Sequence, residues 1–344
     1  MTTSIKIIQP DDWHVHFREA EMLQVVTKYS SRVNRRCIAM PNTSNPITSS
    51  NQALAYKKLI ENNSHSEYFE ALIPCYLTDT LNINDFKYAL QNKIFVGGKL
   101  YPNNATTNSH HGVNDIKKIY NIFEILEKEN CILLIHGELN RDDIDIFDRE
   151  KYFIDEELFE IRKTFKDLKI VLEHVSSAYG VDFVNTNKNI GGTITPHHML
   201  LTKDDVFKNE EINPLNYCMP VVKNESDLLS LRKAACFDND KFFLGTDSAP
   251  HLTKDKIQNE SLKAGIFSSP CSLELYANIF EEERALHNLE KFSSINGPKF
   301  YGLDINSQVL TLTKKETDVA EYTEEGNIKI KNFFAGKKIN WKVS

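Results

Sequence analysis

The chain has 344 residues, of which 41% are hydrophobic and 26% are charged, and its formal net charge is −7. These proportions are typical of a globular protein with a large core. The acidic balance, and the absence of basic runs interleaved with aromatic residues, argue against nucleic acid as a partner. No apolar stretch approaches the roughly 18 residues that span a bilayer, so we expect no membrane association.

The start of the chain and its cysteines indicate a compartment. Met1 leads into the apolar run 5–8 without the pattern of a signal peptide. The six cysteines are scattered singly, with no Cys-x-x-Cys spacing. Such a distribution fits reduced thiols better than disulfides. We therefore expect a cytoplasmic protein.

Short apolar runs rich in β-branched residues alternate with helical patterns along the chain. The runs predict eight strands, near residues 5–8, 37–40, 69–75, 94–96, 131–135, 170–172, 192–195 and 242–244. Apolar residues spaced by three and four positions predict helices, among them 51–62, 113–130, 155–167 and 226–237. Alternating strands and helices favour a parallel sheet with right-handed crossovers. We predict an α/β fold that closes into a (β/α)₈ barrel of the TIM type, a fold for which this length is ordinary.

A doubly wound open sheet is the alternative fold, but no Gly-x-Gly-x-x-Gly turn follows the first strand. Neither an internal repeat nor a linker rich in proline, glycine or serine marks a second domain. Residues 1–344 are therefore predicted to form one domain. Within it, residues 306–344 resemble short strands and charged turns, and we expect them to form a small peripheral extension outside the barrel.

Side chains that can bind metals stand at the ends of the predicted strands. His14 and His16 lie two residues apart, so that both point to one face of an extended chain. The ends of four later strands carry Lys99, His136, His174 and Asp247. In (β/α)₈ enzymes the active site lies at the carboxyl ends of the strands. The pattern therefore predicts that these side chains gather at one face of the barrel.

Four histidines, an aspartate and a lysine exceed the ligand set of a single tetrahedral zinc. They suit two metal ions about 3.5–4 Å apart, as in metal-assisted hydrolases. An ammonium group would repel the metals, but Lys99 can react with CO₂ to give a carbamate, whose two oxygens can bridge both ions. A free amine would instead suggest Schiff-base chemistry, which the surrounding histidines argue against. With a bridging hydroxide, the site keeps a positive charge that favours anionic substrates.

Nine motifs run in order along the chain. They are Asp-Asp-Trp-His-Val-His-Phe-Arg (11–18), Met-Pro-Asn-Thr (40–43), Gly-Lys-Leu-Tyr-Pro (98–102), Asn-Ala-Thr-Thr-Asn-Ser (104–109), His-Gly-Glu (136–138), Glu-His-Val-Ser-Ser (173–177), Thr-Pro-His-His-Met (195–199), Gly-Thr-Asp-Ser-Ala-Pro-His (245–251) and Asn-Gly-Pro-Lys-Phe-Tyr-Gly (296–302). Together they resemble the dihydroorotases of the amidohydrolase superfamily, in the shorter class found in bacteria and fungi. Phe17 and Glu19 replace the leucine and aspartate common in that family, and neither stands at a ligand position.

The resemblance implies two Zn²⁺ ions in each subunit of a homodimer, bridged by carbamylated Lys99 and a hydroxide. It implies that one zinc is bound by His14, His16, Lys99 and Asp247, and the other by Lys99, His136 and His174. Asp247 is also the implied catalytic base.

The resemblance further implies a substrate site in which Arg18, Asn42 and His251 hold a carboxylate. The backbone near Met219 and Ala264 would contact the substrate ring, with His136 adjoining it. The stretch 252–264, however, differs in length from its relatives. Residues 103–112 resemble the mobile loop of the family, in which Thr106 and Thr107 would bind substrate and exclude water on closure.

The implied activity is the reversible cyclisation of N-carbamoyl-L-aspartate to L-dihydroorotate with release of water, in pyrimidine biosynthesis. A hydantoinase, dihydropyrimidinase or allantoinase would share the dinuclear site without requiring the carboxylate-binding Arg18, Asn42 and His251. An inactive paralogue acting as a scaffold is a third possibility, although such proteins usually lose ligands. Glu138 and Glu173 adjoin predicted ligands, but neighbours along a strand need not share a face, so the sequence gives them no role.

Overall fold

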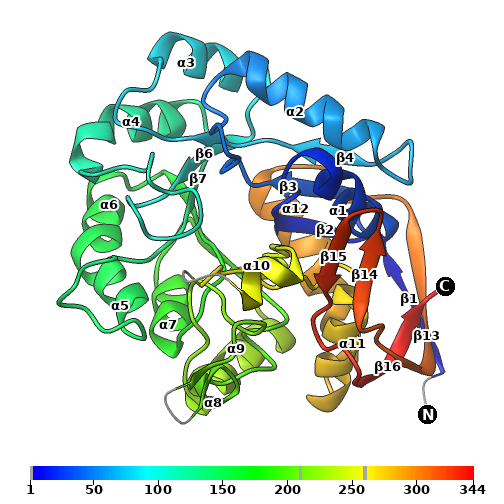
Figure 1. Cartoon of the computed structure of the whole chain (residues 1–344). Coiled ribbons are helices and arrows are strands. Elements are labelled where there is room, and N and C mark those ends of the chain that lie inside the picture. The colour runs from blue at the N-terminus through cyan, green and yellow to red at the C-terminus, as the bar shows by residue number, and fades with distance from the viewer. Residues whose placement is uncertain (1–2, 209–210, 259–261) are drawn as a thin grey trace.

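The computed structural model describes residues 3–208, 211–258 and 262–344 and shows a ring of parallel strands surrounded by helices (Figure 1). Eight strand positions make up the ring in this part of the chain, one of them shared by β4 and β5. The strands are β2 (Asp11–Val15), β3 (Arg36–Ala39), β4 (Glu70–Leu72), β5 (Cys75–Tyr76), β6 (Gly97–Leu100), β7 (Ile132–Ile135), β8 (Lys169–Leu172), β9 (Ile190–Ile194) and β12 (Phe242–Leu244).

Parallel ladders join these strands in the order β2-β3-β4 and β5-β6-β7-β8-β9-β12. The ring closes where the chain leaves β12, because the backbone N–H of Asp247 donates to the carbonyl of His14 at 2.9 Å. The N–H of His16 donates in turn to the carbonyl of Ser248 at 3.1 Å. The predicted (β/α)₈ barrel is therefore confirmed.

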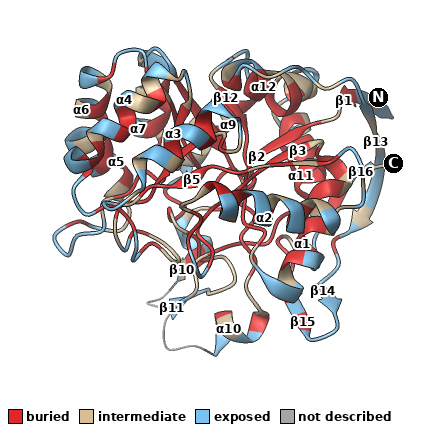
Figure 2. Ribbon diagram, turned by 90° about the horizontal axis from the view of Figure 1, so that it is seen from above, coloured by how far each residue is buried: buried red, intermediate tan, exposed pale blue. Residues whose placement is uncertain are grey.

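Most of the helices lie around the ring and turn a buried side toward it (Figure 2). Those in the described residues are α1 (Ala20–Val33), α2 (Ser50–Asn62), α3 (Ile83–Gln91), α4 (Tyr120–Lys128), α5 (Arg149–Phe153), α6 (Phe159–Thr164), α7 (Ala178–Thr186), α8 (Lys203–Val206), α9 (Glu225–Cys236), α10 (Thr253–Ile257), α11 (Ser272–Glu282) and α12 (Asn296–Tyr301). Short helical turns adjoin them at Ile116–Ile119, Ile154–Leu158, Leu286–Asn288 and Lys291–Ile295. None of the helices in the described residues has the length and apolar character needed to cross a membrane.

The N-terminal apolar run is a strand, but it lies outside the barrel. This strand, β1 (Ser4–Ile8), pairs antiparallel with β13 (Val309–Asp318), which pairs with β16 (Lys338–Val343). The prediction that this run leads the barrel is therefore wrong, and β2, which contains His14, takes that position. β2 escapes a periodicity search because all five of its residues are buried, so apolar and polar residues do not alternate.

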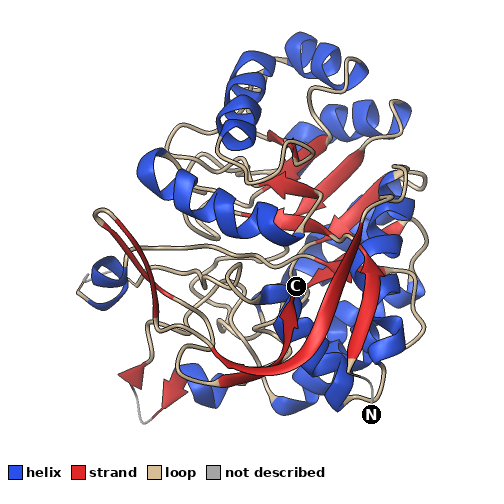
Figure 3. Cartoon of the chain, turned by 90° about the vertical axis from the view of Figure 1, so that its right-hand side faces the viewer, coloured by secondary structure: helices blue, strands red, loops and turns tan. Residues whose placement is uncertain are grey.

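The outer sheet of β1, β13 and β16 brings both ends of the chain to one side of the molecule (Figure 3). β16 packs against α11, where the buried Trp341 donates its Nε1–H to Glu281 at 3.1 Å. Two small antiparallel strand pairs complete the described structure. They are β10 (Phe207–Lys208) with β11 (Glu211–Ile212), and β14 (Tyr322–Glu325) with β15 (Ile328–Lys331). The assignment of residues 306–344 as a peripheral extension of a single domain stays a prediction.

The fourth barrel strand starts later than predicted, at Gly97 rather than at residue 94. Glycine is depleted in strands, so the hydrophobic pattern placed the strand at the apolar residues just before Gly97. A Cβ atom on Gly97 would lie only 2.2 Å from the carbonyl oxygen of Ile132 in β7. The close approach of β6 and β7 therefore requires glycine at this position.

We expect Gly97→Ala to lower the free energy of unfolding by about 1–3 kcal/mol or more, because its methyl group meets backbone that cannot move aside. Gly98→Ala is the matched control, since its methyl would meet side-chain carbons of Leu77 and Leu126 at 3.0–3.2 Å. Flexible side chains can shift, so this variant should lose less. Urea unfolding of both variants measures the difference, and equal losses would contradict the backbone clash.

Candidate active site

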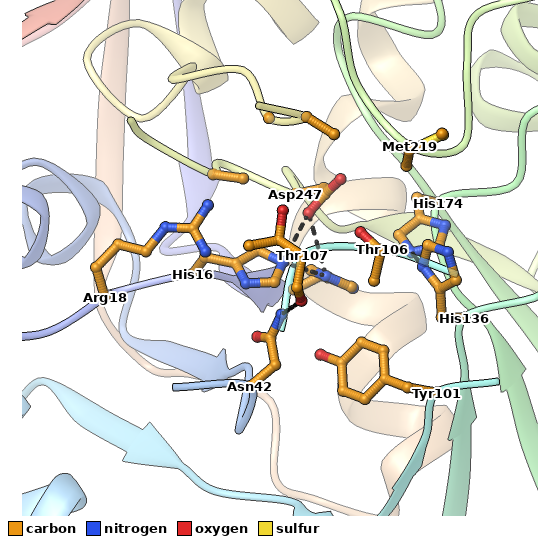
Figure 4. A pocket seen from close by; sticks show the side chains of 14 residues that line it. His16, Arg18, Asn42, Tyr101, Thr106, Thr107, His136, His174, Met219 and Asp247 are labelled. Carbon is orange, nitrogen blue, oxygen red and sulfur yellow. Dashed lines mark hydrogen bonds and ion pairs between the residues drawn. The ribbon is translucent and has the colours of Figure 1, made fainter. Parts of the chain in front are cut away.

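A pocket opens at the carboxyl ends of the barrel strands (Figure 4). Most of the predicted site residues line it: His14, His16, Arg18, Asn42, Thr106, Thr107, His136, His174, Met219, Asp247 and Ala264. The remaining two adjoin it. His251 contacts Arg18, and the fully buried Lys99 places its Nζ 4.6 Å from the centre of the Tyr101 ring. The structure thus brings every predicted site residue to one region.

Left-handed backbone at three of these residues aims side chains that a straight strand would not direct into the pocket. His174 has φ 42°, Asp247 has φ 44° and Arg18 has φ 61°. Such angles are uncommon in residues other than glycine and persist only where the surrounding structure holds them. Each of the three residues comes shortly after a barrel strand, where the chain turns away from the sheet.

Three lone-pair donors converge at the seam where the barrel closes. The Nε2 atoms of His14 and His16 lie 3.3 Å apart, and both lie within 3.2 Å of Asp247 Oδ1. Burial lowers the pKa of His14 and lowers that of His16 to about 3, so both rings are neutral. A neutral imidazole is the form that binds metals. The donor set therefore fits a divalent cation, with geometry that brings all three atoms together.

A second pair of histidines lies directly beside the first. The Nδ1 atom of His136 is 3.0 Å from Nε2 of His174, and the His174 ring centre is 5.0 Å from that of His14. Burial lowers the pKa of both His136 and His174. These rings are neutral too, and their facing nitrogens can hold a second cation.

Lys99 stands behind the two histidine pairs, with its Nζ in contact with Glu173. Burial lowers the pKa of Lys99 well below its ordinary value. An amine in its neutral form is the species that adds to CO₂. The position and state of Lys99 therefore suit the carbamate that a bridging ligand requires.

Arg18 lies on the side of the pocket away from His136 and His174 (Figure 4) and forms a polar group with His251. The Arg18 Nη2 lies 3.1 Å from His251 Nε2, and its Nε donates to the carbonyl of Pro250 at 3.0 Å. The carbonyl of Ala264 also lies 2.9 Å from His251 Nε2. The guanidinium is the cationic member of this group and matches a carboxylate in shape and charge.

The loop 103–112 is tied to the end of β3 by two hydrogen bonds through Asn42. The Asn42 amide donates to the carbonyl of Thr107 at 3.0 Å, and Asn108 donates to the carbonyl of Asn42 at 3.0 Å. Thr106 and Thr107 therefore face the pocket. These two bonds hold the loop at the pocket.

Three further residues at the site had no role in the sequence analysis. Tyr101 lines the pocket with a buried hydroxyl that has no partner among the described residues. Glu138 contacts Nε2 of His136 at 3.1 Å, and Glu173 contacts His14 as well as Lys99. All three stand within the recognised motifs, but only their orientation in the fold shows which atoms they reach. His198, by contrast, bonds Thr195 and the Pro220 carbonyl, as a structural residue would.

Comparison with known proteins shows which family the chain belongs to. Residues 6–314 match the Amidohydrolase family. A dihydroorotase of Buchnera aphidicola subsp. Acyrthosiphon pisum is 43% identical, covering 98% of this chain and 97% of the relative. One from Yersinia enterocolitica is also 43% identical, covering 99% of this chain and 98% of the relative. The chain belongs to the dihydroorotases of the amidohydrolase family.

Solved dihydroorotases have the same fold along their whole length. The enzyme from Saccharomyces cerevisiae, in complex with 5-fluoroorotic acid, superposes with a TM-score of 0.93 at 33% identity, covering 100% of this chain and 99% of that one. The one from Campylobacter jejuni gives 0.91 at 30% identity, covering 100% and 98%. L-hydantoinase of Arthrobacter aurescens, at 15% identity and a TM-score of 0.81, shares the fold alone, covering 98% of this chain and 82% of its own.

Proposed function

We propose that this chain catalyses the reversible cyclisation of N-carbamoyl-L-aspartate to L-dihydroorotate with release of water, the third step of pyrimidine biosynthesis. Its membership of the dihydroorotases supports this reaction. The observation that carries the proposal is the cationic Arg18–His251 group, which lies at the same pocket as the converging donors of His14, His16 and Asp247 and on the side away from His136 and His174 (Figure 4). One side of the pocket suits the substrate carboxylate, and the other suits the metals that activate the ring amide.

The proposal includes two Zn²⁺ ions bridged by carbamylated Lys99. His14, His16 and Asp247 would hold one ion, His136 and His174 the other, and Lys99 both. Nitrogen and oxygen donors of this kind suit zinc, and they also accept manganese or cobalt. When bound, the two metals would polarise the ring amide carbonyl and make water a stronger nucleophile.

In the hydrolytic direction, Asp247 accepts a proton as water attacks the ring amide and then delivers it to the departing nitrogen. In the biosynthetic direction the same steps run in reverse, on the side-chain carboxylate of carbamoyl aspartate. Arg18, Asn42 and His251 hold the carboxylate that does not react. The backbone near Met219 and Ala264 faces the ring, and closure of the loop with Thr106 and Thr107 excludes water.

The decisive assay follows the ring opening of L-dihydroorotate by the purified protein as a loss of ultraviolet absorbance. Hydantoin, dihydrouracil and allantoin serve as matched substrates, because they are cyclic amides or ureides without the carboxylate on the ring. Turnover of dihydroorotate far above the other three is expected. A preference for any of the three would contradict the proposal and favour a related cyclic amidohydrolase, and failure to turn over all four would favour a scaffold role.

Arg18→Met should lower kcat/KM for dihydroorotate by about 10- to 100-fold, because a charge-assisted hydrogen bond contributes about 1.5–3 kcal/mol. Arg18 touches no predicted metal donor, so the zinc content should not change. Arg141→Met, which removes an arginine paired with Glu156 at the surface, is the control. An unchanged kcat/KM in the Arg18 variant would remove this residue from the carboxylate site.

Two wider features belong to the same proposal. We propose a cytoplasmic location, because the six cysteines are all free thiols and five of them are buried.

We also expect a homodimer, as the family resemblance implies. Light scattering during gel filtration tests this, since a mass near the single-chain value of 39.6 kDa would contradict it.

A further inference from the structure

Glu173 is a fully buried carboxyl group that follows β8 and reaches two predicted metal ligands at once. Its Oε2 contacts the Nζ of Lys99, and its Oε1 lies 3.0 Å from Nδ1 of His14. Among the described residues, neither this Oε1 nor the Nδ1 of His14 makes a hydrogen bond, so the two buried atoms face each other with no other polar group to satisfy them. Both carboxyl oxygens are thus committed to groups that belong to the metal site.

The backbone explains how two successive residues serve the same site. Side chains alternate along a strand, so Glu173 and His174 would point to opposite faces if β8 continued straight. The chain instead turns left-handed at His174, with φ 42°, and the N–H of His174 donates to Thr193 Oγ1 at 2.7 Å. Glu173 therefore faces the strand-borne ligands His14 and Lys99, and His174 is free to face His136.

We propose that Glu173 is a positioning residue of the metal site, holding Lys99 and His14 by the atoms that do not bind metal. The inference rests on the proposed dinuclear centre. In the loaded site, Glu173 Oε1 would accept the proton on Nδ1 of His14, which lies 3.0 Å away, and the lone pair of Nε2 would then be directed at the side of His16 and Asp247. Partners of this kind fix both the tautomer and the orientation of a ligating histidine.

The contact to Lys99 serves both states of that residue. The free amine has N–H groups, and the carbamate keeps one N–H on the same nitrogen. Glu173 Oε2 can therefore accept a hydrogen bond from the Lys99 nitrogen both before and after carbamylation. The new carboxylate group would remain available to the metals. His14 and Lys99 each turn a nitrogen toward Glu173. A carboxylate suits both, because it offers two acceptor oxygens and no donor.

The need for two acceptor oxygens can be tested by a single substitution. Glu173→Gln keeps the size of the side chain but exchanges one acceptor for an NH₂ donor, so either His14 or Lys99 then faces a donor. Glu150→Gln is the matched control. Glu150 is equally buried and accepts hydrogen bonds from Ser176 and Ser177 in the loop after β8, but it touches no predicted metal ligand.

The experiment measures metal retention rather than activity. Zinc-loaded wild type, Glu173→Gln and Glu150→Gln are dialysed against a graded series of chelator, and zinc per subunit is determined by mass spectrometry. Glu173→Gln should retain zinc about 10- to 100-fold more weakly, the usual cost of removing such a partner. The cobalt-substituted variant should also show a changed visible absorption spectrum, because the ligand geometry at one metal changes. Glu150→Gln should match wild type in both.

Wild-type zinc affinity and an unchanged cobalt spectrum in Glu173→Gln would overturn the proposal, as would equal losses in Glu173→Gln and Glu150→Gln. If the glutamine variant fails to fold, Glu173→Asp takes its place, since it keeps the charge but withdraws the oxygens from both partners. A wild type that binds two zinc ions but does not open dihydroorotate would contradict the proposed reaction and leave the role of Glu173 intact. A wild type that retains no zinc would overturn both.

Discussion

Asp247→Asn should lower kcat by about 10²–10⁴-fold, both for ring opening of L-dihydroorotate and for cyclisation of N-carbamoyl-L-aspartate. This is the usual contribution of a positioned general acid–base group. The amide oxygen of asparagine can still face His14 and His16, but an amide does not accept and return a proton at neutral pH. The loss should therefore appear in kcat and persist when the site is fully loaded with zinc. Steady-state kinetics at measured metal content tests this.

Asp12→Asn is the matched control for that experiment. Asp12 is also buried at the barrel seam, where its oxygens accept hydrogen bonds from the N–H and hydroxyl of Thr246. Burial raises the pKa of Asp12 to about 7, so a neutral side chain is tolerated there. The amide oxygen can still accept from the N–H of Thr246, and the amide nitrogen can donate to the Thr246 hydroxyl oxygen, so most of the activity should remain. Activity near the wild-type level in the zinc-loaded Asp247 variant would remove Asp247 from the role of proton carrier.

Removal of the metals should abolish turnover, and Zn²⁺ supplied with bicarbonate should restore it. The reason is electrostatic, because water is a weak nucleophile at neutral pH without cations to lower its pKa. The test is prolonged dialysis against a chelator, with zinc content and ring opening measured on the same samples. Zinc without bicarbonate, added under CO₂-free gas, separates the metal requirement from the carbamate requirement. Full activity in metal-free protein would contradict metal-assisted hydrolysis, and full recovery without bicarbonate would contradict the need to re-form a carbamate.

Hydrophobic patterning predicted the barrel strands in which large apolar residues follow one another, as in β7, β8 and β12. It failed at β6, because the approach to β7 demands glycine, a residue that patterning counts against a strand. It also placed β1 in the barrel, since a half-buried apolar run has the same pattern in a barrel as in an outer antiparallel sheet. Partner choice depends on contacts with β13, some 300 residues later in the chain, which no local pattern contains.

The candidate site was easier to predict than the fold details, because its ligand types are rare and stand at strand ends. The pairing of His14 with His16 follows from strand geometry alone. The placement of His174 at the same site as Glu173 does not, because it depends on the left-handed backbone at His174. A single dihedral angle there decides whether two neighbouring residues face the same site, and the residue type does not reveal it.

The hydrogen bonds between His14 and Asp247 have a consequence for synthesis of the protein. These residues are 233 positions apart in the chain, and the first of them leaves the ribosome long before the second. Until then β2 lacks one neighbour and presents a free edge of the kind that promotes association with other chains. The nascent protein thus passes through a stage with two imidazoles exposed and no carboxylate to complete their metal site. Zinc can reach its final geometry only after the barrel has closed. We therefore expect only full-length chains to bind the metal.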